Sequence, residues 1–218
     1  MILIDVRVKR IHLSSEERSL ATAASAREAL RLEFLSQISA SRPAYQSWCQ
    51  LRIDELVLKR MIVKYSEQLV YRPLEEVMYW FAYSSGAFLE PGYPPLFYSR
   101  SEHKAVSPNK SAVAGIGEGV AGLIGQQLYK CRKLARPNHD YPDIVMEGNH
   151  RTYLIESKAT LTAGSSEIES VIEQELVRFA SYISSCAQLD NRVVVGLLVG
   201  TALMSETSYS TCITEIIV

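Results

Sequence analysis

Three charged residues in the second half of the chain have a spacing that suits metal chemistry. Asp143 follows Pro142, and Glu156 and Lys158 lie thirteen and fifteen residues further along. Two carboxylates held close together repel each other unless a divalent cation lies between them, and hard oxygen ligands favour Mg²⁺ or Mn²⁺. A lysine beside them would orient or deprotonate an attacking water, or offset charge that develops on a phosphoryl group.

The residues between these acids predict a β-hairpin. A polar turn at Gly148-Asn149 separates two short apolar runs, which is typical of antiparallel strands. The thirteen residues from Asp143 to Glu156 suffice to run out along one strand and back along the next. Side chains two residues apart share a face of a strand, so Glu156 and Lys158 point together. The alternative interpretation is a surface salt bridge between these two residues.

The motif resembles that of the PD-(D/E)xK nucleases, a family whose common core is also that of many restriction endonucleases. Pro142-Asp143 and Glu156-x-Lys158 match the family motif residue by residue, and the resemblance covers residues 109 to 203. It implies an α/β fold with a restriction-endonuclease-like mixed sheet flanked by helices. It also implies hydrolysis of phosphodiester bonds by a Mg-activated water, with a 5′-phosphate product.

The resemblance assigns a role to each site residue. Asp143 and Glu156 would hold Mg²⁺ (or Mn²⁺), the carbonyl of Ser157 would add a ligand, and Lys158 would position the attacking water. Glu118 would complete or orient the site, because an acid on the helix before the first core strand does so in the family. Glu118 is also an isolated acid in an apolar segment and needs a partner; the alternative is a solvated helix residue.

The predicted elements around the motif follow the order of the family core. Gln174 and Arg178 on the second core helix are candidates for a phosphate contact, and a solvent-facing position is the alternative. The elements are a helix at 109–130, a strand near Lys133 to Ala135, the two hairpin strands, a helix from Ser165 or Ser166 to Gln188, and a strand at 193–199.

The first helix also contains a glycine pattern that formally fits a dinucleotide-binding fingerprint. Gly117, Gly119 and Gly122 have the G-x-G-x-x-G spacing, which lets a pyrophosphate approach a helix N-terminus when a strand directly precedes the loop. Residues 107–114 are too broken to predict such a strand. We therefore favour the alternative that these small residues let the helix pack closely against a sheet.

Composition places the chain among ordinary globular proteins. Its 218 residues are 47% hydrophobic and 22% charged, and no apolar run has the length of a membrane helix. The N-terminus lacks the layout of a signal peptide, so a cytoplasmic protein without a membrane partner is expected. The cysteines form no C-x-x-C pair and are expected to be reduced thiols: Cys49, Cys131, Cys186 and Cys212.

The net charge of −1 conceals an uneven distribution. Residues 100–136 carry a net charge of +5, residues 137–218 a net charge of −7, and residues 1–99 a net charge of +1. A basic approach to an acidic metal site suits a phosphodiester substrate, although scattered surface charge would give similar counts. DNA is the expected partner, and RNA is the alternative.

The first 100 residues predict a mainly α-helical region, followed by a nuclease core at 101–218. Helices are expected from a capping box at Ser14 through about Ile38, from Pro43 to Tyr65, and from Pro73 onward. The boundary falls in the segment rich in proline and glycine between residues 86 and 109. These helices are candidates for binding DNA, forming a homodimer or contacting another subunit in a larger complex.

Three smaller expectations concern the two ends and the aromatic residues. Strand-like runs at 2–8 and 211–218 would pair with each other or extend the core sheet. Four aromatic residues form a contact patch or, as we favour, the core of the helical region. They are Tyr79, Trp80, Phe81 and Tyr83.

Three functional hypotheses remain open from the sequence. The first is a Mg-dependent DNA endonuclease. The second is a catalytically silent DNA-binding or assembly subunit that keeps the nuclease fold, although retention of the full motif argues against it. The third is an RNA endonuclease, for which His103 is the only candidate for an upstream metal-binding histidine.

Overall fold

The fold was analysed in a computed structural model of the chain. The structure describes residues 1–41, 44–84, 87–90, 96–99, 108–137, 141–162, 164–189 and 192–218. For residues 39–41, 83–84, 87–90 and 96–99 it describes the backbone alone.

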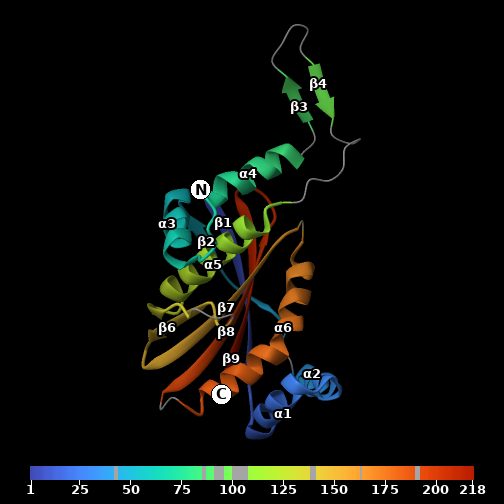
Figure 1. The fold of residues 1–218 in the computed structure, drawn as a ribbon, viewed down its shortest axis with the longest axis vertical. Coiled ribbons are helices and arrows are strands. Elements are labelled where there is room, and N and C mark those ends of the chain that lie inside the picture. Colours follow the sequence, from blue (N-terminus) through green and yellow to red (C-terminus); the bar gives the residue numbers. More distant parts are fainter. Residues whose placement is uncertain are drawn as a thin grey trace.

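The centre of the molecule is a seven-stranded mixed β-sheet (Figure 1). Its strands lie in the order β2-β1-β9-β8-β7-β6-β5. β1 is parallel to β9 and β7 is parallel to β8, whereas the other neighbours are antiparallel. The strands are β1 (Ile2–His12), β2 (Gln46–Ile53), β5 (Arg132–Ala135), β6 (Ile144–Gly148), β7 (Arg151–Leu161), β8 (Val193–Leu203) and β9 (Ser208–Ile217).

Helices cover both faces of this sheet, and each face buries its own apolar cluster. Three helices pack on the first face: α3 (Glu55–Tyr65), α4 (Pro73–Ser84) and α5 (Lys110–Gln127). The other three pack on the second face: α1 (Ser15–Ala26), α2 (Glu28–Ser41) and α6 (Ser165–Cys186). None of the helices in the described residues is long and apolar enough to cross a membrane.

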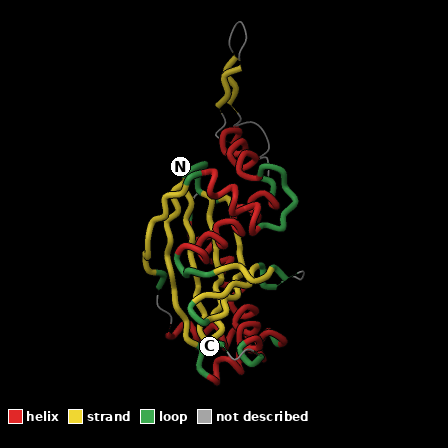
Figure 2. The backbone as a smooth tube through the Cα atoms, turned by 90° about the vertical axis from the view of Figure 1, so that its left-hand side faces the viewer, coloured by secondary structure: helices red, strands yellow, loops and turns green. Residues whose placement is uncertain are grey.

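A second, two-stranded sheet stands apart from the main body. β3 (Ala87–Glu90) and β4 (Leu96–Ser99) form an antiparallel hairpin. Figure 2 shows it projecting from the end of the molecule, beyond the last turn of α4.

The prediction that the chain opens with a helical region is wrong. The N-terminus begins with β1, a strand of eleven residues, and β2 replaces the first part of the helix expected from Pro43. In β2 the partly buried side chains alternate with exposed ones, Cys49 and Leu51 leading to buried Ile53, so a period of two was misread as a helical face. Asp54 then caps α3 by accepting a hydrogen bond from the Leu56 amide.

The helix predicted from Ser14 to Ile38 is in fact two helices. Its capping box is confirmed, because Ser14 accepts a hydrogen bond from the Glu17 amide and Glu17 accepts one from the Ser14 amide. Arg27 has an extended backbone, which separates α1 from α2. Both expectations for the chain ends are confirmed, because β1 pairs with β9 and both belong to the main sheet.

The aromatic residues of α4 divide between two environments. Phe81 packs against the core beneath α5 and contacts Trp80 edge to face, whereas Tyr79 is 69% exposed. The Tyr83 side chain lies outside the described residues. All four cysteines are free thiols.

The elements predicted around the motif are confirmed in type and order. α5, β5, β6, β7, α6 and β8 follow one another along the chain, and each lies within a few residues of its predicted position. Asn109 caps α5 by accepting hydrogen bonds from the amides of Ser111 and Ala112. This succession places the hairpin that carries the motif between the two helix layers.

Candidate metal centre

The β6–β7 hairpin positions both ends of the motif. β6 pairs with β7 from Ile144 to Gly148. The turn residues Asn149 and His150 have φ angles of 50° and 59°, the left-handed conformation that a tight two-residue hairpin turn requires. Asp143 therefore lies just before the first paired residue of β6, next to the part of β7 that carries the second acid.

Asp143 is partly buried and extends the hydrogen bonding of the hairpin. Its Oδ2 atom accepts a hydrogen bond of 2.7 Å from the backbone N–H of Ser157. Burial raises the pKa of Asp143 to about 6; the Ser157 hydrogen bond opposes this rise and the charge of Glu118 adds to it. The ionised carboxylate is thus disfavoured unless a cation approaches it.

Glu156 and Lys158 share one face of β7, as the strand period predicts. Leu154, two residues earlier, belongs to the cluster beneath α6, so both charged side chains lie on the α6 side of the sheet. The Lys158 Nζ atom donates a hydrogen bond of 2.8 Å to Oε1 of Glu156. Burial lowers the pKa of Lys158, but Glu156 and the charges of Glu175 and Asp143 outweigh it and raise the pKa overall. Lys158 therefore remains a cation.

The second oxygen of Glu156 is buried without a hydrogen-bond partner among the described residues. Glu156 is 2% exposed, and no group in the described part of the chain donates a hydrogen bond to its buried Oε2 atom. Burial, followed by the charge of Asp143, raises the pKa of Glu156 to about 7. A buried carboxylate oxygen without a donor is costly, and a metal ion is one partner that would satisfy it.

Glu118 has partners within the protein. It is 5% exposed in the middle of α5 and accepts hydrogen bonds from the Glu67 backbone amide at 2.9 Å, the Gln68 side chain at 3.3 Å and Arg136 at 3.2 Å. Arg136 therefore supplies part of the compensation that the buried Glu118 carboxylate needs. This carboxylate is nevertheless close enough to Asp143 to act on the same ion.

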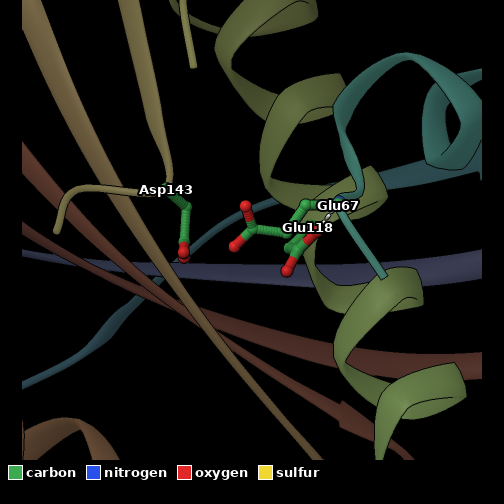
Figure 3. Close-up of side chains that lie close together, drawn as sticks. All are labelled: Glu67, Glu118 and Asp143. Carbon is green, nitrogen blue, oxygen red and sulfur yellow. Dashed lines mark hydrogen bonds between the residues drawn. The ribbon is translucent and has the colours of Figure 1, made fainter. Parts of the chain in front are cut away.

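Glu67 joins these acids, and sequence analysis missed it. Figure 3 shows the carboxylates of Glu67, Glu118 and Asp143 converging from a loop, a helix and the start of a strand. Ligand oxygens of the three lie within 4.8 Å of one another. Glu67 follows α3 in a loop that no sequence motif marks, so only the packing of α3 against α5 reveals it.

Arg136 is the cation between two of these acids. Its Nε atom lies 3.2 Å from Glu67, its Nη2 atom 3.2 Å from Glu118, and its Nη1 atom donates to the backbone carbonyl of Tyr65. The Arg136 side chain is 16% exposed. It fixes the loop after α3 onto α5 and the end of β5, and it offsets part of the negative charge near Asp143.

The two residues proposed for phosphate contact lie on the α6 side of the sheet. Gln174 is exposed, and its backbone carbonyl accepts a hydrogen bond of 2.5 Å from Arg31. Arg178 is also exposed, and its guanidinium lies 4.7 Å from the centre of the Tyr141 ring. Arg178 therefore borders the motif through the residue before Pro142, whereas the backbone of Gln174 contacts α2.

The glycines of α5 serve close packing. They lie inside the helix, so they cannot form the loop before a helix N-terminus that a dinucleotide needs. A Cβ on Gly117 would lie 2.6 Å from the Ala159 side chain, and one on Gly122 would lie 2.2 Å from the Tyr65 ring. Because these glycines have no side chains, α5 lies close to the sheet, and Glu118 on this helix lies near Asp143.

Comparisons with protein-family models, curated proteins and solved structures found no match to this chain.

Proposed function

We propose that this chain is a metal-dependent nuclease of the PD-(D/E)xK type that cleaves phosphodiester bonds within DNA. The buried Oε2 atom of Glu156 carries this proposal, because none of the described residues donates a hydrogen bond to it, while Lys158 occupies the other oxygen of the same carboxylate. Burial raises the pKa values of both acids; the charge of Asp143 adds to the rise at Glu156, and the charge of Glu118 adds to the rise at Asp143. A divalent cation between them would favour the ionised form of both acids.

The residues present fit a hard divalent ion such as Mg²⁺ or Mn²⁺. Asp143 and Glu156 offer carboxylate oxygens, and the carbonyl of Ser157 points to the same side of β7 as its N–H, which binds Asp143. Glu118 and Glu67 offer ligand oxygens within 4.8 Å of one on Asp143, so Glu118 would complete or orient the site from the α5 side. When bound, the ion would polarise the phosphoryl group and lower the pKa of a coordinated water.

The chain's own charged groups take complementary roles in this proposal. Lys158, held as a cation by Glu156, orients the attacking water and offsets negative charge that develops on the phosphoryl group. Arg136 keeps Glu118 and Glu67 in place, so that the acidic group is formed before the substrate binds. The order of helices and strands around the hairpin also supports assignment to this family.

One observation favours a second candidate, a catalytically silent DNA-binding or assembly subunit. Arg136 already neutralises two carboxylates, an arrangement that a purely structural ion-pair network would show as well. The RNA endonuclease hypothesis gains no such support. His103, its candidate histidine, lies outside the described residues.

Cleavage assays with several nucleic acids test the proposal. Plasmid, linear duplex, single-stranded DNA and RNA are incubated with Mg²⁺ or with EDTA. We expect Mg-dependent cleavage of DNA that falls about 100-fold or more in Asp143→Ala and in Lys158→Ala. The matched controls are Glu33→Ala and Arg27→Ala, two exposed charges in the α1–α2 segment.

The outcomes separate the candidates. Activity that survives both site substitutions would reject the site assignment. Cleavage of RNA alone would move the proposal to the RNA endonuclease. Absence of cleavage together with DNA binding that ignores Mg²⁺ would favour the silent subunit.

A further inference from the structure

A second charged feature lies at the far end of the hairpin from Asp143. A groove of about 730 Å³ opens beside the β6–β7 turn. One carboxylate, one histidine and four permanent cations line it, which gives a net charge of +3 with the histidine neutral. The cations are Lys130, Arg132, Arg151 and Arg192, the carboxylate is Glu147 and the histidine is His150.

Glu147 holds two of the arginines at the groove. Its Oε1 atom accepts a hydrogen bond of 2.6 Å from Arg132, and its Oε2 atom accepts one of 2.8 Å from Arg192. The two arginine side chains are nevertheless 78% and 53% exposed. A guanidinium carries five N–H donors, so the exposed Arg132 can hold Glu147 and still bind an anion.

Further cations continue from this groove toward the metal centre. They follow β5, the edge strand that begins with Arg132. The Lys133 Nζ atom donates a hydrogen bond of 2.7 Å to the backbone carbonyl of Lys64, and Arg136 comes next on the Glu118 side. Burial lowers the pKa of Lys133, and the positive charges of Arg136 and Lys64 lower it further. Like charges therefore gather at this end of β5. Such crowding favours a polyanion as the natural counterion.

We propose that this groove binds the phosphate backbone of duplex DNA, and that the β5 cations continue this contact to the metal centre. DNA as the polyanion rests on the proposed function. Gly148 lies five positions after Asp143, which corresponds to about 17 Å along an extended strand. Successive phosphates of one DNA strand advance by about 3.4 Å along the helix axis. The groove and the metal centre therefore lie about five nucleotides apart along a bound duplex.

The salt dependence of DNA binding in EDTA tests this groove without cleavage. A labelled duplex is titrated with the full chain at several salt concentrations, and fluorescence anisotropy gives the association constant. The test variant is Lys130→Gln/Arg151→Gln. The control is Arg18→Gln/Arg27→Gln on the α1 segment, which packs against α6 on the other face of the sheet.

We expect the double groove variant to reduce the slope of log K against log salt by about 1.8, and to bind about 10- to 100-fold more weakly at low salt. The control should change the slope by less than half as much. Lys130, Arg151 and Arg27 are exposed and Arg18 is partly buried, so we expect all four replacements to leave the fold intact. Unchanged thermal midpoints of both double variants would show this.

Three other outcomes would overturn the inference. Equal losses in both double variants would mean that only total charge matters, and a wild-type chain that fails to bind duplex DNA would remove the ligand. Displacement of the DNA by inorganic phosphate at constant ionic strength would identify a small-anion site instead. Groove-dependent binding without cleavage would reject the proposed nuclease yet keep this groove, so the two failures are distinguishable.

Discussion

Replacement of Glu156 by glutamine removes a buried acid whose ionisation the fold disfavours. Its pKa rises from the ordinary 4.5 to about 7, and each pKa unit corresponds to about 1.4 kcal/mol. Ionisation of Glu156 in the metal-free folded chain therefore costs about 3 kcal/mol. This cost already includes the hydrogen bond from Lys158, which lowers the pKa, so the variant should gain about 3 kcal/mol at pH 8.

The sign of the pH dependence follows from the direction of the shift. Below pH 4 the acid is protonated in both the folded and the unfolded chain, and the variant should differ little from the wild type. Between about pH 4.5 and pH 7 the unfolded chain ionises first, so the wild type loses stability as pH rises. Above pH 7 the full difference is present. Urea unfolding in EDTA at pH 4, 5, 6, 7 and 8 measures it.

Matched measurements decide whether the acid itself is responsible. Glu33→Gln, at an exposed position of α2, should show no such trend. Mg²⁺ should stabilise the wild type at pH 8, by about 2.7 kcal/mol at one hundred times its dissociation constant, and should leave Glu156→Gln nearly unchanged. A stability difference between Glu156→Gln and wild type that is independent of pH, or that favours the wild type more as pH rises, would refute the reasoning.

Two further substitutions test the packing and charge of the site. Arg136→Ala should destabilise the chain by about 3–5 kcal/mol, because it leaves the buried Glu118 carboxylate without its cation. Urea unfolding measures this difference. A loss of stability below about 1 kcal/mol would contradict the ion-pair network. Gly122→Ala should cost about 2–3 kcal/mol, since its Cβ would overlap the buried Tyr65 ring. Gly164→Ala, at the N-cap of α6 and with nothing within 4 Å, should cost less than about 1 kcal/mol. Equal thermal midpoints for these two variants would refute close packing at Gly122.

The parts of the fold that sequence predicted are those with strong local signals. The turn at Gly148-Asn149 and the apolar runs beside it define the hairpin without help from the rest of the chain. The long apolar stretch of α5 and the unbroken run of β8 are equally clear. By contrast, β2 was misread because its short alternating pattern, followed by the capped helix α3, fits a longer helix almost as well.

The missing parts of the site depend on contacts between distant segments. Glu67 lies in a loop whose position follows from the packing of α3 on α5, and Arg136 reaches Glu118 only because β5 ends beside that helix. Neither residue has a spacing that identifies it. The parallel pairing of β1 with β9 is likewise set by the whole sheet, because the two strands stand at opposite ends of the chain.

Anomalous scattering from crystals soaked with Mn²⁺ shows directly whether Asp143 and Glu156 hold one divalent ion. We expect a peak in contact with carboxylate oxygens of both residues, on the side of β7 where the Ser157 carbonyl points. A peak held by Glu67 and Glu118 away from Glu156, or no peak at saturating Mn²⁺, would contradict this expectation.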